Sequence, residues 1–156
     1  MAMRRHAREW VVQFLFQRDF NAENLERALT DFWNEKQADP NLRRFTEELI
    51  RGVLDQLAEL DAKIAAYAEH WDMKRMNGVD RNVIRLALYE MLYRPDIPPV
   101  VSINEAVDIA KSFSAPESGR FVNGILDRAR KDLDRPSREA VSDQGAGFGV
   151  QSSGKK

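Results

Sequence analysis

Four basic side chains gather within the first eight residues of the chain: Arg4, Arg5, His6 and Arg8. The planar guanidinium of arginine binds phosphate through paired hydrogen bonds and stacks on nucleobases, which a lysine ammonium does less well. A solvated helix start is the alternative interpretation, although positive charge at that end opposes the helix dipole. We therefore expect this cluster to bind nucleic acid, and single-stranded RNA in particular.

Residue types for catalysis or metal binding are sparse. The chain has no cysteine and two histidines, His6 and His70, which excludes thiolate zinc sites and cysteine nucleophiles. His70 is followed by Trp71 and Asp72, but adjacent helix positions do not face one another. Neither a GxSxG elbow nor a GxxxxGK[ST] phosphate loop occurs. The sequence thus predicts a protein that is not an enzyme and that holds no cofactor and no metal.

The charge balance excludes binding of nucleic acid by bulk charge alone. The 156 residues include 24 basic and 25 acidic side chains, a formal net charge of −1. Residues 1–18 nevertheless carry four arginines against one glutamate, and residues 19–39 carry six acidic against two basic side chains. This distribution could serve two different partners, with chance arrangement of solvated charge as the alternative.

Hydropathy indicates a soluble chain with its own core. Hydrophobic residues make up 43% of the sequence, enough to bury a core of ordinary size. No apolar run approaches the roughly 18–20 residues of a membrane span. The first residues, MAMRRHAREW, lack the apolar stretch of a signal peptide. We expect a cytoplasmic protein without membrane contact.

Helical periodicity recurs from residue 3 to residue 134, whereas alternation of apolar and polar residues never persists. The sequence therefore predicts an all-α fold of about seven helices. The expected helices lie near residues 7–15, 22–36, 40–64 (continuous or broken near Asp61), 81–94, 102–113 and 114–133. Their expected N-caps are Asn21, Asp39, Asp80, Ser102 and Ser114.

Two further segments differ from this pattern. Gly52 lies inside an apolar helical stretch, where glycine costs about 1 kcal/mol relative to alanine, so we interpret it as a close contact between helices. Residues 135–156 hold four of the eight glycines and four serines without a periodic apolar face. We expect a disordered tail there, following a helical domain at residues 1–134.

Three motifs follow one another in an order typical of a known family. They are RRHARE at residues 4–9, VDRNVIRLALYEMLYRPDIPPVVSINEAVDIAKSF at residues 79–113, and RFVNGILDRA at residues 120–129. In these motifs the chain resembles the bacterial transcription antitermination factor NusB family, over about residues 4–134. The tail lies outside the resemblance.

The resemblance implies two small helical bundles packed together and a role in transcription. Such proteins bind the boxA element of ribosomal RNA operons as single-stranded RNA, together with the ribosomal protein NusE. The complex joins the RNA polymerase antitermination complex and promotes processive elongation. Members occur as monomers or homodimers, so a homodimer is a further assembly to expect.

The resemblance also implies roles for individual residues. RNA contacts carry over to Arg4, Arg5 and Arg8, with His6 in a usually basic position, and extend to Arg85 and Lys111. Contacts with partners carry over to Phe16, Asp80 and Asp127. Phe16 stands where a tyrosine is common, which removes a hydroxyl group.

Alternatives remain open from the residues themselves. Arg85 could instead face solvent or pair with Asp80 or Glu90, and Asp127 could be an ordinary surface acid. The whole chain could instead serve as a protein interaction module. It could also be part of RNA-modification machinery, since some ribosomal RNA methyltransferases carry a NusB-like domain, although neither a βαβ pattern nor a cysteine nucleophile is present here.

Overall fold

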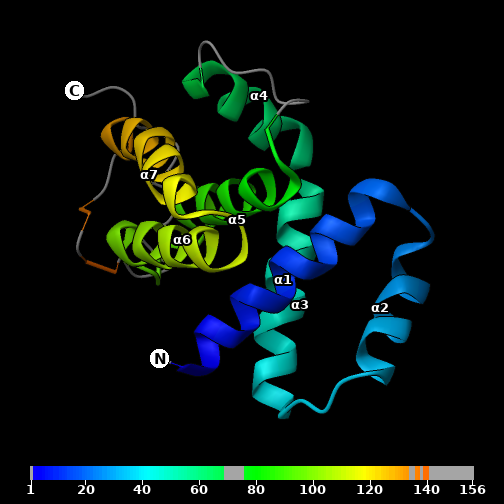
Figure 1. The fold of residues 1–156 in the computed structure, drawn as a ribbon. Coiled ribbons are helices and arrows are strands. Elements are labelled where there is room, and N and C mark those ends of the chain that lie inside the picture. The colour runs from blue at the N-terminus through cyan, green and yellow to red at the C-terminus, as the bar shows by residue number, and fades with distance from the viewer. Residues whose placement is uncertain (1, 69–75, 134–135, 138, 141–156) are drawn as a thin grey trace.

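The computed structural model describes residues 2–68, 76–133, 136–137 and 139–140 (Figure 1). Within these residues it contains seven α-helices and no strand, which confirms the expected all-α fold. The helices are α1 (Ala2–Phe20), α2 (Leu25–Asn34), α3 (Pro40–Asp55), α4 (Leu57–Ala68), α5 (Gly78–Tyr93), α6 (Pro99–Phe113) and α7 (Pro116–Lys131). Most of the expected tail lies outside the described residues, and so does His70.

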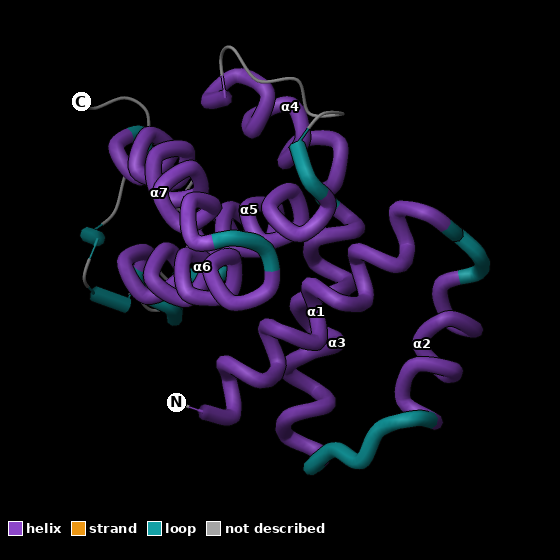
Figure 2. Tube along the Cα trace, in the orientation of Figure 1, coloured by secondary structure: helices purple, strands orange, loops and turns teal. Residues whose placement is uncertain are grey.

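The helices form two packed groups that share α5 as their central element. Helices α1, α2 and α3 lie together on one side, and α4, α6 and α7 lie around the other side of α5 (Figures 1 and 2). Helix α5 contacts α1, α3, α4, α6 and α7, and residues 82–88 of α5 are all buried. The expectation of two small packed bundles is therefore confirmed.

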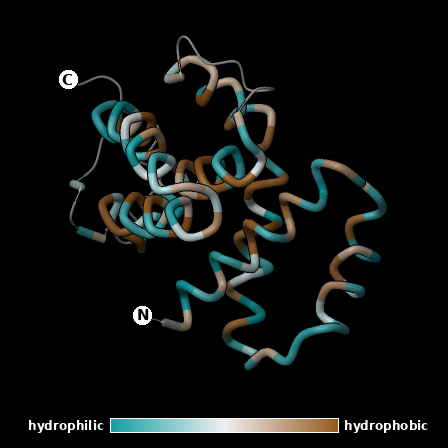
Figure 3. Tube along the Cα trace, viewed as in Figure 1, coloured by the Kyte–Doolittle hydropathy of each residue, from teal (hydrophilic) through white to brown (hydrophobic). Residues whose placement is uncertain are grey.

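The apolar face predicted for the first helix is buried against α3 and α5. Ala7, Val11, Phe14 and Leu15 are each at most 4% exposed. Along the trace, apolar segments of α1, α3 and α5 alternate with polar ones at the helical repeat (Figure 3). Burial of this face places the polar and charged start of α1 at the edge of the core.

Aromatic rings attach α2 to the rest of the first group. Trp10 on α1 meets Trp33 on α2 edge to face, with centroids 5.6 Å apart. Phe14 meets Phe32 in the same way at 5.4 Å. Such pairs stabilise a contact by about 0.5–1.5 kcal/mol beyond the area they bury. One aromatic cluster thus attaches α2 to α1.

Some of the expected caps are confirmed and others are wrong. Asp39 accepts hydrogen bonds from the backbone N–H groups of residues 41 and 42 at 3.1 and 3.3 Å, as a cap should. Helix α2 is capped by Asn24 rather than Asn21, and α5 by Asn77, whose side chain accepts from the Asp80 N–H at 2.9 Å. The break after α3 falls at Gln56, not near Asp61.

The two expected capping boxes are also wrong. Helices α6 and α7 begin at Pro99 and Pro116 and have no side-chain cap. Proline at the first helical position has the right φ and lacks an N–H that would have no intrahelical partner there. Ser102 therefore lies inside the first turn of α6, and Ser114 ends that helix instead of beginning the next.

Two close contacts complete the fold. A Cβ atom at Gly52 would lie 2.1 Å from the Tyr89 ring on α5, which confirms the interpretation of this glycine as a helix contact. The backbone N–H of Val100, in the first turn of α6, donates to the Ser137 carbonyl at 2.9 Å. Residue 137 thus satisfies one of the N–H groups that a helix start leaves without an intrahelical partner.

Candidate nucleic-acid interface

Arg4 and His6 lie on the surface at the start of α1. The Arg4 guanidinium lies 4.3 Å from the centroid of the Phe45 ring, and no ion pair holds it within the described part of the chain. The His6 ring packs on Trp10 with centroids 4.3 Å apart. Both residues are exposed, and each side chain lies against an aromatic ring.

Part of the Arg5 guanidinium is hydrogen-bonded to carboxylates on α6. Its guanidinium donates two hydrogen bonds to Glu105, and Nη2 donates to Asp108 Oδ2 at 2.9 Å. The Arg5 side chain remains 33% exposed. Burial alone would raise the pKa of Glu105, but the hydrogen bonds and charge of Arg5 outweigh it and hold that pKa below its usual value. Arg5 therefore joins α1 to α6 and still faces solvent with part of its guanidinium.

Arg8 is buried although it belongs to the same cluster. Its side chain is 5% exposed, and its Nε and Nη2 donate to the Glu90 carboxylate at 2.7 and 3.0 Å. Glu90 lies on α5, is fully buried, and also accepts a hydrogen bond from Ser102 Oγ at 2.5 Å. The ion pair between Arg8 and Glu90 joins α1 to α5, and the hydrogen bond from Ser102 joins both to α6. A contact between Arg8 and RNA stays a prediction, whereas its contact with Glu90 gives it a positioning role.

Arg85 is likewise enclosed by acceptors. Its side chain is 9% exposed and donates two hydrogen bonds to Asp61, at 2.7 and 2.8 Å, and one to Asp19 at 3.0 Å. The pKa of Asp19 is lowered, because hydrogen bonds from Asn82 and Arg85 outweigh the effect of burial. The ion-pair alternative for Arg85 is therefore confirmed, but with Asp19 and Asp61 in place of the expected partners Asp80 and Glu90.

Lys111 is exposed near the end of α6. Its aliphatic chain passes over Gly119 on α7, where an added Cβ atom would lie 2.6 Å from Lys111 Cγ. The glycine thereby allows the lysine to lie flat across the two helices with its ammonium toward solvent.

The three residues proposed for partner contacts have different surroundings. Phe16 is 36% exposed and packs edge to face on Phe20, which is 76% exposed. Asp80 is 5% exposed, and burial raises its pKa even though Ser118 donates to its Oδ2 at 3.0 Å. Asp127 lies on the surface of α7 and pairs with Arg130 at 2.6 Å. Of these three residues, Phe16 and Asp127 are therefore accessible to a partner at the surface.

The carboxylates that pair with the buried arginines were not found from the sequence. Glu90 belongs to α5, a helix in which residues 82–88 are all buried, and an acid in such a helix signals a buried cation partner. Nothing local identifies that partner, because Arg8 and Glu90 are 82 residues apart. Asp19 and Asp61 carry no comparable signal.

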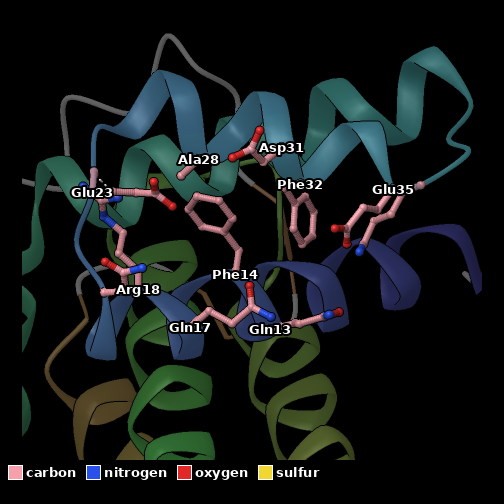
Figure 4. Close-up of a pocket in the computed structure, with 11 residues that line it drawn as sticks. Gln13, Phe14, Gln17, Arg18, Glu23, Ala28, Asp31, Phe32 and Glu35 are labelled. Carbon is pink, nitrogen blue, oxygen red and sulfur yellow. Dashed lines mark hydrogen bonds between the residues drawn. The ribbon is translucent and has the colours of Figure 1, made fainter.

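A cleft of about 280 Å³ lies between α1 and α2 (Figure 4). Phe14 and Phe32 line it together with polar and charged side chains of both signs. At one end, Arg18 donates to the Glu23 carbonyl at 2.9 Å. The cleft is separate from the start of α1 that carries Arg4 and His6.

Together these features define a small all-α protein, with a cationic helix start set on two bundles that buried ion pairs join. Among the described residues, no group of His, Asp and Glu converges to hold a metal ion. In the same residues, no helix is long and apolar enough to cross a membrane.

The chain belongs to the NusB family, whose family model matches residues 5–131. The transcription antitermination protein NusB of Methylacidiphilum infernorum is 43% identical over 136 residues, which cover 86% of this chain and 95% of that protein. The solved structure of NusB from T. maritima is 41% identical and covers 88% of this chain and 93% of its own, with a TM-score of 0.76.

A third comparison concerns the fold. The crystal structure of antitermination factors NusB and NusE in complex with dsRNA matches with a TM-score of 0.76 and 24% identity, and it covers 84% of this chain and 98% of that one. At this identity the likeness extends to the arrangement of helices.

Proposed function

We propose that this protein is a transcription antitermination factor. It binds boxA RNA of ribosomal RNA operons together with NusE and so promotes processive elongation by RNA polymerase. The observation that carries the proposal is the family membership over residues 5–131, combined with a cationic helix start at which Arg4 and His6 face solvent. The role is one of binding in the cytoplasm, without a catalytic step, and residues 1–134 form the unit that performs it.

The start of α1 would provide the RNA contact. Arg4 and the exposed part of Arg5 bind phosphate, and the exposed ring of His6 lies beside them on the same helix start. Arg8 and Arg85 act through the fold, because their buried ion pairs hold α1 against α5. A few cations on a near-neutral protein give modest affinity that decreases with salt in proportion to the number of phosphate contacts.

NusE would supply the rest of the surface. Phe16 and Asp127 are the surface residues that we assign to the protein partner, and Lys111 extends the cationic area. When two proteins bind one RNA side by side, each raises the affinity of the other by the same factor. Sequence is then read from unstacked bases, as is usual for single-stranded RNA.

The test is fluorescence anisotropy with labelled boxA RNA and a scrambled RNA, with and without NusE. We expect boxA to bind more tightly than the scrambled RNA, and NusE to increase the difference. Arg4→Gln should weaken boxA binding roughly 3- to 10-fold. Arg27→Gln is the matched control, since it removes the same charge from the exposed face of α2.

The outcomes separate the proposal from its alternative. Equal, weak binding of both RNAs, with and without NusE, would contradict the proposal and leave a helical module that binds proteins alone. Equal losses in the Arg4 and Arg27 variants would contradict the assignment of the contact to α1.

A further inference from the structure

A cationic cleft of about 250 Å³ lies beside the start of α1, on the side that faces α3. Its lining comes from the beginnings of α1 and α3 and from the end of α5: Met3, Arg4, Asn41, Leu42, Arg44, Phe45, Glu48 and Arg94. Three arginines and one carboxylate therefore face the same space. The cleft shares Arg4 with the proposed RNA contact.

The charge of Arg44 is not neutralised by its hydrogen-bond partner. Its Nη2 donates to the side-chain oxygen of Asn41 at 2.7 Å, and an amide is a neutral acceptor. Arg94 differs, because it donates to both carboxylate oxygens of Asp96 at 3.0 Å and to Glu48 at 3.4 Å. The lining of the cleft thus carries three arginines against one carboxylate, and only Arg94 of the three is ion-paired within the described residues.

Aromatic rings lie beside this cleft and beside a second cleft next to it. The Phe45 ring lies beneath Arg4, at 4.3 Å, and beneath Arg94, at 5.5 Å. A second, more open cleft of about 610 Å³ shares Glu48 and Arg94 with the first and extends to Tyr93. Tyr93 is 39% exposed and stacks on Tyr89 with centroids 5.5 Å apart. An exposed ring fixed by a second ring can receive a nucleobase.

We propose that these two clefts form a second subsite for the same single-stranded RNA. Arg4 and Arg44 bind successive backbone phosphates, and a base further along the strand stacks on Tyr93. This inference rests on the proposed function and extends it to α3 and α5. An acidic peptide would also suit the arginines, but the shared Arg4 and the exposed tyrosine ring favour RNA.

Arg43 offers a matched control next to Arg44. Both are exposed residues in the first turns of α3. Arg43 lies 5.1 Å from the centroid of Trp33 and 3.6 Å from a Glu47 oxygen, and it does not line either cleft. Arg43→Gln and Arg44→Gln change the net charge of the protein by the same amount. A difference in RNA binding between the two variants therefore reports on the position of the arginine and not on the net charge.

The experiment measures binding of the full chain to boxA RNA with unpaired nucleotides on both sides, across a series of salt concentrations. Arg44→Gln should weaken binding roughly 3- to 10-fold and lower the slope of log K against log salt by about one. Arg43→Gln should stay within about twofold of the unchanged protein. Tyr93→Leu should weaken binding at least about fivefold, as loss of one base stack would.

The results distinguish failure of the second subsite from failure of the proposed function. If the unchanged protein binds boxA and Arg44→Gln behaves like Arg43→Gln, the second subsite is wrong and the proposed function stands. If Arg44→Gln is weakened but Tyr93→Leu is not, the extension of the subsite to the second cleft is wrong. If the unchanged protein does not prefer boxA to scrambled RNA, both proposals fail.

Discussion

Arg4 and Arg8 lie one helical turn apart on α1, yet their surroundings are opposite. The Arg4 guanidinium lies on the surface over the Phe45 ring, without a carboxylate partner among the described residues. The Arg8 guanidinium is buried and shares two hydrogen bonds with Glu90. The role of each arginine therefore depends on the carboxylates that the fold brings near it, and not on its residue type alone.

The largest effect is expected from removal of the buried cation. Arg8→Met should lower the free energy of unfolding by about 3–5 kcal/mol, because it leaves the Glu90 charge buried without a partner. Urea denaturation followed by circular dichroism measures the loss. The double variant Arg8→Met with Glu90→Met should recover much of it, since neither charge is then buried. A single variant within about 1 kcal/mol of the unchanged protein would refute the structural role of the pair.

A smaller effect is expected at Arg5, whose ion pair is only partly buried. Because Arg5 holds the pKa of Glu105 below its usual value of 4.5, this carboxylate stabilises the fold above that pH. The contribution, about 1 kcal/mol, is lost as the pH falls below 4.5 and Glu105 takes up a proton. The thermal midpoint of Glu105→Gln should therefore fall less between pH 6 and pH 3 than that of the unchanged protein. Parallel curves would show that the pair adds no stability.

The smallest effect on stability is expected at the surface. Arg4→Gln should change the free energy of unfolding by no more than about 0.5–1 kcal/mol, the value of an exposed contact between a cation and a ring. The same denaturation measurement checks it. A loss as large as that of Arg8→Met would mean that Arg4 also supports the fold, and that reduced RNA binding by this variant reports on folding.

Local patterns predicted the helices well, because each one repeats its apolar residues at the helical period. Of the caps, only Asp39 was predicted correctly; the caps of α2 and α5 are Asn24 and Asn77 instead of Asn21 and Asp80, and α6 and α7 have no side-chain cap. The distinction between Arg4 and Arg8 could not be predicted. It depends on Glu90, which the chain brings to α1 from 82 residues away.

The hydrogen bond from Val100 to Ser137 bears on where a shortened version of this protein could safely end. Helix α7 ends at Lys131, so a fragment cut just after it would keep all seven of the described helices. Such a fragment would nonetheless lose the Ser137 carbonyl, which accepts the Val100 N–H at the start of α6. It would also lose the hydrogen bond from Arg130 to the Ser137 hydroxyl at 3.4 Å. A fragment designed for crystallography or spectroscopy should therefore run to residue 137 at least.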